Sequence, residues 1–245
     1  MASHFARWTL TDSSVPEHRL SAQTVDYARA FPERRRIRYL ASRTLLAELM
    51  WRVYGIAQLP EVITTSTGRP QFADSSLPDF SIGYASNIVA VLLAEEGGRA
   101  GLGMEIVRAH SRQTLELHSR DISSGEKAWI RAQADPDEAA TQLWALRQSV
   151  LKLTDETSDC SSLQLHPASG RLRSARCPDI EAISDVEALI IWSCALAPAS
   201  ERLHLWEFDG RQNWRRLQDI QTHTHNMGPR TVRLTSLPPE KSLHA

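Results

Sequence analysis

The chain has 245 residues, which is enough for one large domain or two modest halves. Hydrophobic residues make up 42% and charged residues 23%, and the net charge of −1 gives no overall field that favours nucleic acid or a membrane surface. The longest apolar run, 188–197, is too short to span a bilayer. Three cysteines fit neither a disulfide framework nor a zinc site. We therefore expect a cytoplasmic protein that binds neither nucleic acid nor membrane.

The clearest predicted helix covers residues 33–54, because its apolar residues recur at helical spacing between Pro32 and Gly55. A turn, STGRPQF, follows at 66–72. Strand-like runs come next, at 79–86, 88–96 and 102–107. We expect a small meander of strands over the region from the turn to the last of these runs.

A second helix is predicted over residues 136–153, where Asp135 can cap the first turn and Pro136 suits the first helical position. The segment 155–178 is weakly patterned. Two further strands are predicted at 186–197 and 202–208.

These elements predict an α+β fold of two similar halves related by a pseudo-two-fold. Each half would hold a small, largely antiparallel sheet packed against one long helix. We place the halves at 1–108, with the GRP turn and the G-x-G-x-E strand, and 109–245, with the W-x-x-R-Q-x-x-x-K helix and a frayed C-terminal tail.

Four sequence pieces carry the candidate chemistry. They are RYLASRTLL at 38–46, GRPQF at 68–72, FSIGYAS with GLGMEI within 80–106, and WALRQSVLK at 144–152. In the third piece a strand keeps an acid, Glu105, but has no side chain at its same-face neighbour, Gly103. The order and spacing of the pieces resemble the 4'-phosphopantetheinyl transferases, in the monomeric class of two halves that activates carrier proteins.

The resemblance implies a reaction and its partners. A serine hydroxyl of an apo acyl or peptidyl carrier protein would attack the β-phosphate of coenzyme A, and 3',5'-ADP would leave. Mg²⁺ would bridge the pyrophosphate, because that ion takes hard oxygen ligands from carboxylates, water and phosphate. The resemblance also implies a monomer.

The family pattern places metal-binding and proton-accepting acids in G-x-D-x-E and in W-x-x-K-E-x-x-x-K. Glu105 matches the second acid of the strand and is the one metal ligand that this chain keeps. Gly103 stands at the position of the aspartate, and Gln148 at that of the helical glutamate, where it can neither carry charge nor accept a proton. Glu105, Lys152 and the degenerate base position Gln148 are therefore the candidate catalytic residues, and we expect transfer to be weak.

The positions that would hold the coenzyme A phosphates are largely basic. Arg38 and Arg43 match the arginines of the first helix, and Arg69 matches the basic residue of G-[KR]-P. Lys152 matches the last lysine of the helix motif. Two further positions depart from the pattern: Arg147 replaces a lysine and Tyr84 replaces a histidine.

Plainer readings of the same residues stay open. Glu105 can be a solvated acid on an edge strand, Lys152 an exposed helix lysine, and Arg38 part of a solvated arginine face. Tyr84 can be a packing residue. An alternative function also stays open, in which the chain is a catalytically inactive homologue that binds carrier proteins as an accessory factor in a biosynthetic pathway.

Overall fold

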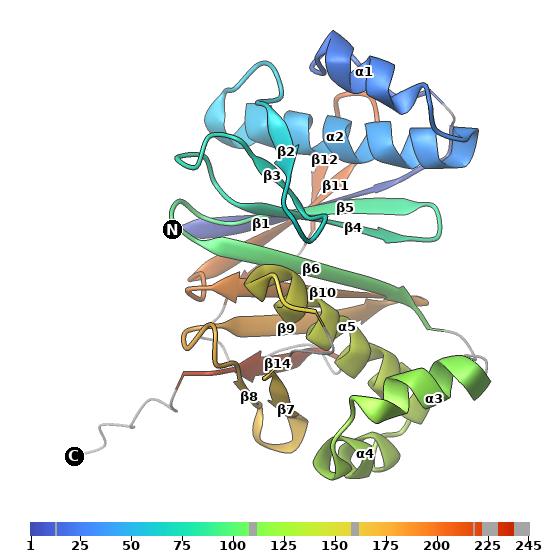
Figure 1. Ribbon diagram of the computed structural model, residues 1–245, viewed down its shortest axis with the longest axis vertical. Coiled ribbons are helices and arrows are strands. Elements are labelled where there is room, and N and C mark those ends of the chain that lie inside the picture. Colours follow the sequence, from blue (N-terminus) through green and yellow to red (C-terminus); the bar gives the residue numbers. More distant parts are fainter. Residues whose placement is uncertain (13, 108–111, 158–161, 218, 222–229, 238–245) are drawn as a thin grey trace.

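The computed structural model describes every residue except 13, 108–111, 158–161, 218, 222–229 and 238–245. The chain forms a mixed α+β fold with two six-stranded sheets and one two-stranded sheet (Figure 1), which confirms the predicted class. Within the described part of the chain, no helix combines the length and the apolar character that crossing a membrane requires.

The first sheet brings the two ends of the chain together. Its strands run in the order β12, β11, β1, β5, β4, with β13 paired to β11. Their bounds are β1 (Ala2–Thr9), β4 (Phe80–Ala85), β5 (Ile88–Leu93), β11 (Arg202–Phe208), β12 (Trp214–Arg216) and β13 (Ile220–Gln221). β1 lies parallel to β11 and antiparallel to β5, so the sheet joins three strands from residues 2–93 to three strands from residues 202–221.

The second sheet follows the order β6, β10, β9, β14, β8, β7. Its strands are β6 (Arg99–Ile106), β7 (Gln164–His166), β8 (Arg171–Arg173), β9 (Glu181–Glu187), β10 (Ile190–Ala197) and β14 (Val232–Thr235). A separate hairpin pairs β2 (Val62–Thr64) with β3 (Pro70–Phe72). β4 and β6 are therefore the end strands of two different sheets.

The helices are α1 (Ala22–Ala28), α2 (Glu33–Tyr54), α3 (Arg112–Arg120), α4 (Ser124–Arg131) and α5 (Pro136–Thr154), with a short 3₁₀ turn, η2 (Pro167–Ser169). α2 ends where Gly55 adopts the left-handed conformation, with φ of 69°. α5 begins at Asp135, whose side chain accepts a hydrogen bond from the backbone N–H of Glu138. Both long helices are where the sequence predicts them.

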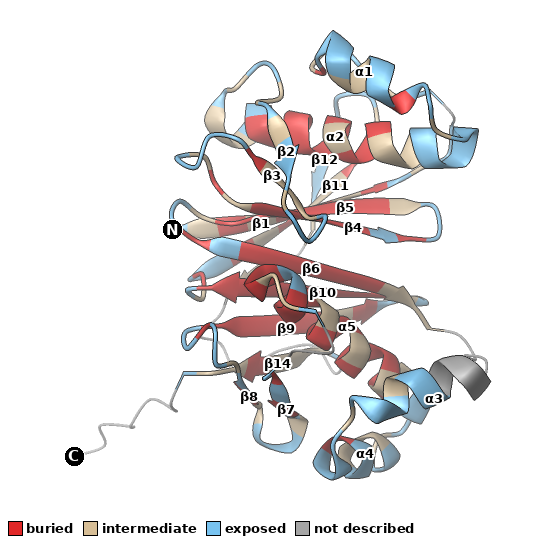
Figure 2. Ribbon diagram, in the orientation of Figure 1, coloured by how far each residue is buried: buried red, intermediate tan, exposed pale blue. Residues whose placement is uncertain are grey.

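Three buried clusters organise the molecule in layers. One lies between the two sheets, where Phe5 of β1 stacks on Trp192 of β10 with ring centroids 5.1 Å apart. A second joins the first sheet to α2, and a third joins the second sheet to α5. Figure 2 shows the result: the central strands of the two large sheets and the inner faces of α2 and α5 are buried, while α1 and the outer helix faces are largely exposed.

Several predicted elements differ from the structure. The strand expected at 186–197 is confirmed over Ile190–Ala197 as β10, but its start is wrong, because the chain turns at Ala188, with φ of 53°, between β9 and β10. The meander is wrong in its last strand, since β6 joins the second sheet. β1, β7 and β8 were not predicted. The boundary between residues 108 and 109 and the tail from 238 lie outside the described residues, and the pseudo-two-fold stays a prediction.

Glycines allow α5 to lie directly on β6. A Cβ atom added to Gly101 would overlap the carbonyl oxygen of Ser149, and one added to Gly103 would overlap that of Ala145. The backbone of α5 therefore occupies the space that side chains would need at both positions. Gly103, the empty place that the sequence reveals, is filled by helix backbone.

We predict that Gly101→Ala and Gly103→Ala each lower the free energy of unfolding by at least about 1–3 kcal/mol, because overpacking a rigid backbone contact forces α5 away from the sheet. Gly125→Ala is the matched control, since Gly125 is exposed in α4 and its Cβ would approach no atom closer than 3.9 Å. That change should gain about 0.5–1 kcal/mol. Urea unfolding of the three variants measures this, and equal stability for all of them would contradict the close packing.

Candidate functional site

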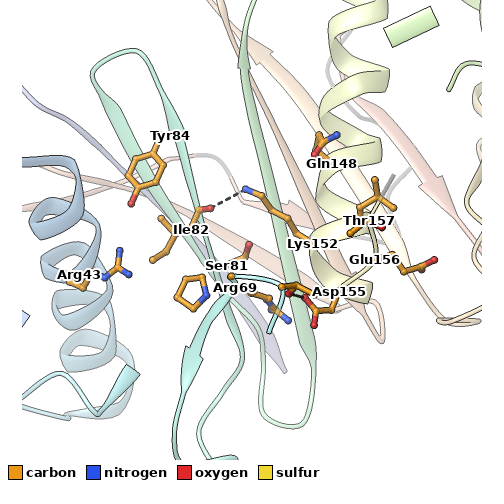
Figure 3. Close-up of a pocket in the computed structure, with 14 residues that line it drawn as sticks. Arg43, Arg69, Ser81, Ile82, Tyr84, Gln148, Lys152, Asp155, Glu156 and Thr157 are labelled. Carbon is orange, nitrogen blue, oxygen red and sulfur yellow. Dashed lines mark hydrogen bonds between the residues drawn. The ribbon is translucent and has the colours of Figure 1, made fainter. Parts of the chain in front are cut away.

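A cavity of about 500 Å³ lies where α2, the turn between β2 and β3, strand β4 and the C-terminal end of α5 meet. Figure 3 shows Arg43 entering from α2 and Gln148 and Lys152 facing it from α5, with β4 between them. The lining residues are Arg43, Thr67, Gly68, Arg69, Pro70, Ser81, Ile82, Tyr84, Gln148, Leu151, Lys152, Asp155, Glu156 and Thr157. The structure thus brings five predicted site residues together: Arg43, Arg69, Tyr84, Gln148 and Lys152.

The floor of the cavity borders the contact between β4 and β6. No backbone ladder joins these two strands in the described sheets, so their edge groups need other partners. Ser81 Oγ accepts a hydrogen bond from Leu102 N at 2.9 Å, and Asp79 Oδ2 accepts one from Ala100 N at 2.8 Å. Side chains therefore satisfy the edge N–H groups between the two sheets, as backbone carbonyls do between paired strands within one sheet.

Arg69 belongs to the cavity and to this contact at once. Its Nη2 donates to Asp79 Oδ2 at 2.6 Å, to the Phe80 carbonyl at 3.2 Å and to the Ala100 carbonyl at 2.8 Å. Among the described residues its buried Nε has no hydrogen-bond partner. The guanidinium is thus fixed beside the cavity, with part of its charge balanced by Asp79.

Lys152 reaches from α5 across β6. Its Nζ donates to the Leu102 carbonyl at 2.8 Å and to the Ile82 carbonyl at 3.2 Å (Figure 3). By exposed area the residue is open to the cavity, while its Nζ lies against β4 and β6 through the two carbonyl groups that it contacts. Burial lowers the pKa of Lys152; the carboxylate of Glu105 opposes this change and Arg69 adds to it. An anion bound beside Lys152 would stabilise its charged form.

Arg43 and Tyr84 make up the opposite wall. The Arg43 guanidinium lies 3.9 Å from the centre of the Tyr39 ring, and its Nη1 donates to Ser42 Oγ at 3.0 Å. Neither contact neutralises the charge. Tyr84 is 37% exposed, so it faces the cavity more than the core. The wall supplies one cation and one hydroxyl group.

Three predicted site residues do not line this cavity. Arg38 donates a hydrogen bond to the Ser86 carbonyl, and Glu105 lies half-buried on β6 opposite Ile191 of β10. Arg147 is buried in an ion pair with Glu126 of α4, with Nη2 and Oε1 2.8 Å apart. Arg147 thus joins two helices, while its neighbour Gln148 faces the cavity.

The residues at the predicted magnesium positions do not fit a site of three carboxylates. Gly103 has no ligand atom, and the space of a side chain is occupied by the backbone of α5. Gln148 offers a neutral amide, and Glu105 is outside the residues that line the cavity.

Sequence reasoning missed the two carboxylates of the cavity wall, Asp155 and Glu156. Asp155 is the C-cap of α5, and its Oδ1 accepts a hydrogen bond from Thr67 Oγ1 of the turn between β2 and β3. Helical periodicity contains the signal, because Asp155 follows Gln148 by two turns on the same face. Glu156 has Arg176 as an ion partner at 4.0 Å.

The chain is similar in sequence to several known proteins. No protein-family model matches the chain. The uncharacterized protein YieE of Escherichia coli K12 is 45% identical over 243 residues, which cover 97% of this chain and 96% of YieE. A protein of Haemophilus influenzae designated as a candidate 4'-phosphopantetheinyl transferase is 28% identical over 211 residues, covering 84% of this chain and 87% of its own length.

A shorter match is to the 4'-phosphopantetheinyl transferase AcpT of Escherichia coli K12, which is 30% identical over 121 residues, 48% of this chain and 57% of AcpT. The chain therefore belongs to one family with YieE, and its distant homologues named 4'-phosphopantetheinyl transferase support membership of that wider superfamily.

Proposed function

We propose that the protein binds coenzyme A in the cavity between α2 and α5 and transfers its phosphopantetheine, slowly, to a serine of a carrier protein. The observation that carries this proposal is the convergence of Arg43, Arg69 and Lys152 on one cavity. Three cations around a concave site suit a ligand with several phosphates. The homologues named as transferases support the reaction class.

The cations have distinct roles in this proposal. Arg43 is free to move toward a phosphate, because its present contacts are a ring and a hydroxyl group. Lys152 would exchange its carbonyl partners for phosphate oxygens. In the transfer itself, the serine hydroxyl gives its proton to a base, the bond from the serine oxygen to the β-phosphorus forms, the bond from that phosphorus to the bridging oxygen breaks, and 3',5'-ADP leaves with the electron pair of that bond. The cations offset that charge.

Gly103 offers no metal ligand and Gln148 offers no proton acceptor, so the proposed reaction is slow relative to that of a chain that keeps both acids. A general base contributes about 10²–10⁴-fold, and Gln148 cannot act as one. The same two positions favour the second candidate function, a non-catalytic factor that binds carrier proteins. We propose a monomeric, cytoplasmic protein in either case.

Incubation of a panel of apo carrier proteins with coenzyme A and this protein, followed by intact mass spectrometry, tests the function. We expect a slow mass gain of one phosphopantetheinyl group, measured with Mg²⁺ and with a chelator. No gain across the panel would contradict transfer. Carrier binding by calorimetry that does not depend on coenzyme A would then favour the accessory factor, and binding of neither partner would contradict both functions.

Arg43→Ala should weaken coenzyme A binding about tenfold or more, because a hydrogen bond to a charged group is worth roughly 1.5–3 kcal/mol. Arg36→Ala is the matched control, since Arg36 is exposed on the same helix and does not line the cavity. Calorimetry at low and moderate salt measures both affinities. If the two variants lose affinity equally, the helix contributes only a general positive field.

Coenzyme A binding should take up protons above neutral pH. The lowered pKa of Lys152 leaves part of its population neutral below the usual value of 10.5, and a bound phosphate restores the ammonium. The affinity for coenzyme A should therefore fall as pH rises from the lowered pKa of Lys152 in the free protein toward its higher pKa in the complex. Binding enthalpies in buffers of different ionisation enthalpy count the protons. Lys152→Met should abolish the uptake and Lys127→Met, an exposed position in α4, should keep it; buffer-independent enthalpies in the native protein would count against the assignment.

A further inference from the structure

Asp155 occupies a position where an acid is unfavourable in three separate ways. It has φ of 58°, a left-handed conformation in which glycine is the most common residue and aspartate is one of the few others tolerated. It follows the C-terminal end of α5, where the helix dipole disfavours a negative charge. It also lines the cavity that Arg43, Arg69 and Lys152 make suitable for an anion, so its carboxylate repels the proposed ligand. Packing and backbone geometry alone would be served better by glycine.

Two features of the structure hold the Asp155 carboxylate at the cavity, where it can contact a bound substrate. Asp155 shares one face of α5 and its end with Gln148 and Lys152, and all three line the cavity (Figure 3). Thr67 donates a hydrogen bond to Oδ1, which fixes the side chain from the opposite wall. Among the described residues, Ser86 and Ala188 are the other non-glycine positions with positive φ, and neither lines the cavity. Strained residues that persist at a site point to a role there.

We propose that Asp155 is the proton acceptor of the transfer reaction, in place of the helical glutamate that this chain lacks at Gln148. This inference rests on the proposed function. The hydroxyl proton of the carrier serine passes to the Asp155 carboxylate while the serine oxygen bonds to the β-phosphorus of coenzyme A. The bond from that phosphorus to the bridging oxygen breaks, and 3',5'-ADP leaves with the electron pair.

Asp155→Asn tests the role with little change of shape, since asparagine also tolerates the left-handed conformation and can accept the hydrogen bond from Thr67. Transfer, measured by mass spectrometry under single-turnover conditions, should fall about 10²-fold or more. Coenzyme A affinity should stay equal or become tighter, because a repulsive charge is removed.

A pair of glycine variants separates this role from a structural one. Asp155→Gly and Ala188→Gly each relieve a left-handed residue, so the Tm of both should equal or exceed that of the native protein. Only Asp155→Gly should lose transfer, since Ala188 is exposed in the turn between β9 and β10.

The outcomes distinguish the two proposals. Native-like transfer by Asp155→Asn would overturn the role of Asp155 and leave the proposed function in place. A parallel loss of transfer, coenzyme A affinity and Tm would show a structural residue and also overturn it. If the native protein transfers nothing to any carrier, the proposed function fails first and the proton acceptor fails with it.

Discussion

The contact between the end strands β4 and β6 joins the two large sheets beside the cavity. It is held by side chains: Asp79 and Ser81 accept from the backbone of β6, while Arg69 and Lys152 donate to carbonyls of both strands. Unpartnered backbone groups at this depth would each cost roughly 1–3 kcal/mol. Because Arg69 and Lys152 also line the cavity, the surface that would bind an anion and the union of the two sheets share the same atoms.

Much of the fold follows from local signals. The two long helices have clear periodicity and caps, and their packing faces could be predicted from the sequence alone. β1 could not, because its partners are residues 202–208 and 88–93, and such distant pairing leaves little local trace. The β9–β10 hairpin was hidden by a turn at Ala188 that contains none of the usual turn residues.

The candidate site divides in the same way. Motif order predicts Arg43, Arg69 and Lys152, which the cavity does bring together. It does not predict that Arg147, one position from Gln148, lies on another side of α5 and pairs with Glu126, because adjacent helix positions point about 100° apart. Gly103 has two interpretations. In the family pattern it lacks a metal ligand, and in the structure it allows the backbone of α5 to contact β6.

The pairing of β1 with β11 has a consequence for biosynthesis. β1 is made before β11, and because one of its two neighbours consists of residues 202–208, the first sheet stays incomplete until those residues have been made. β6 likewise has no strand partner in its sheet until β10 has been made. Nascent chains would expose one edge of β1 until β11 is made and one edge of β6 until β10 is made, and such edges invite association with other chains. The need for chaperones therefore falls in the intervals between the synthesis of these strands and that of their partners.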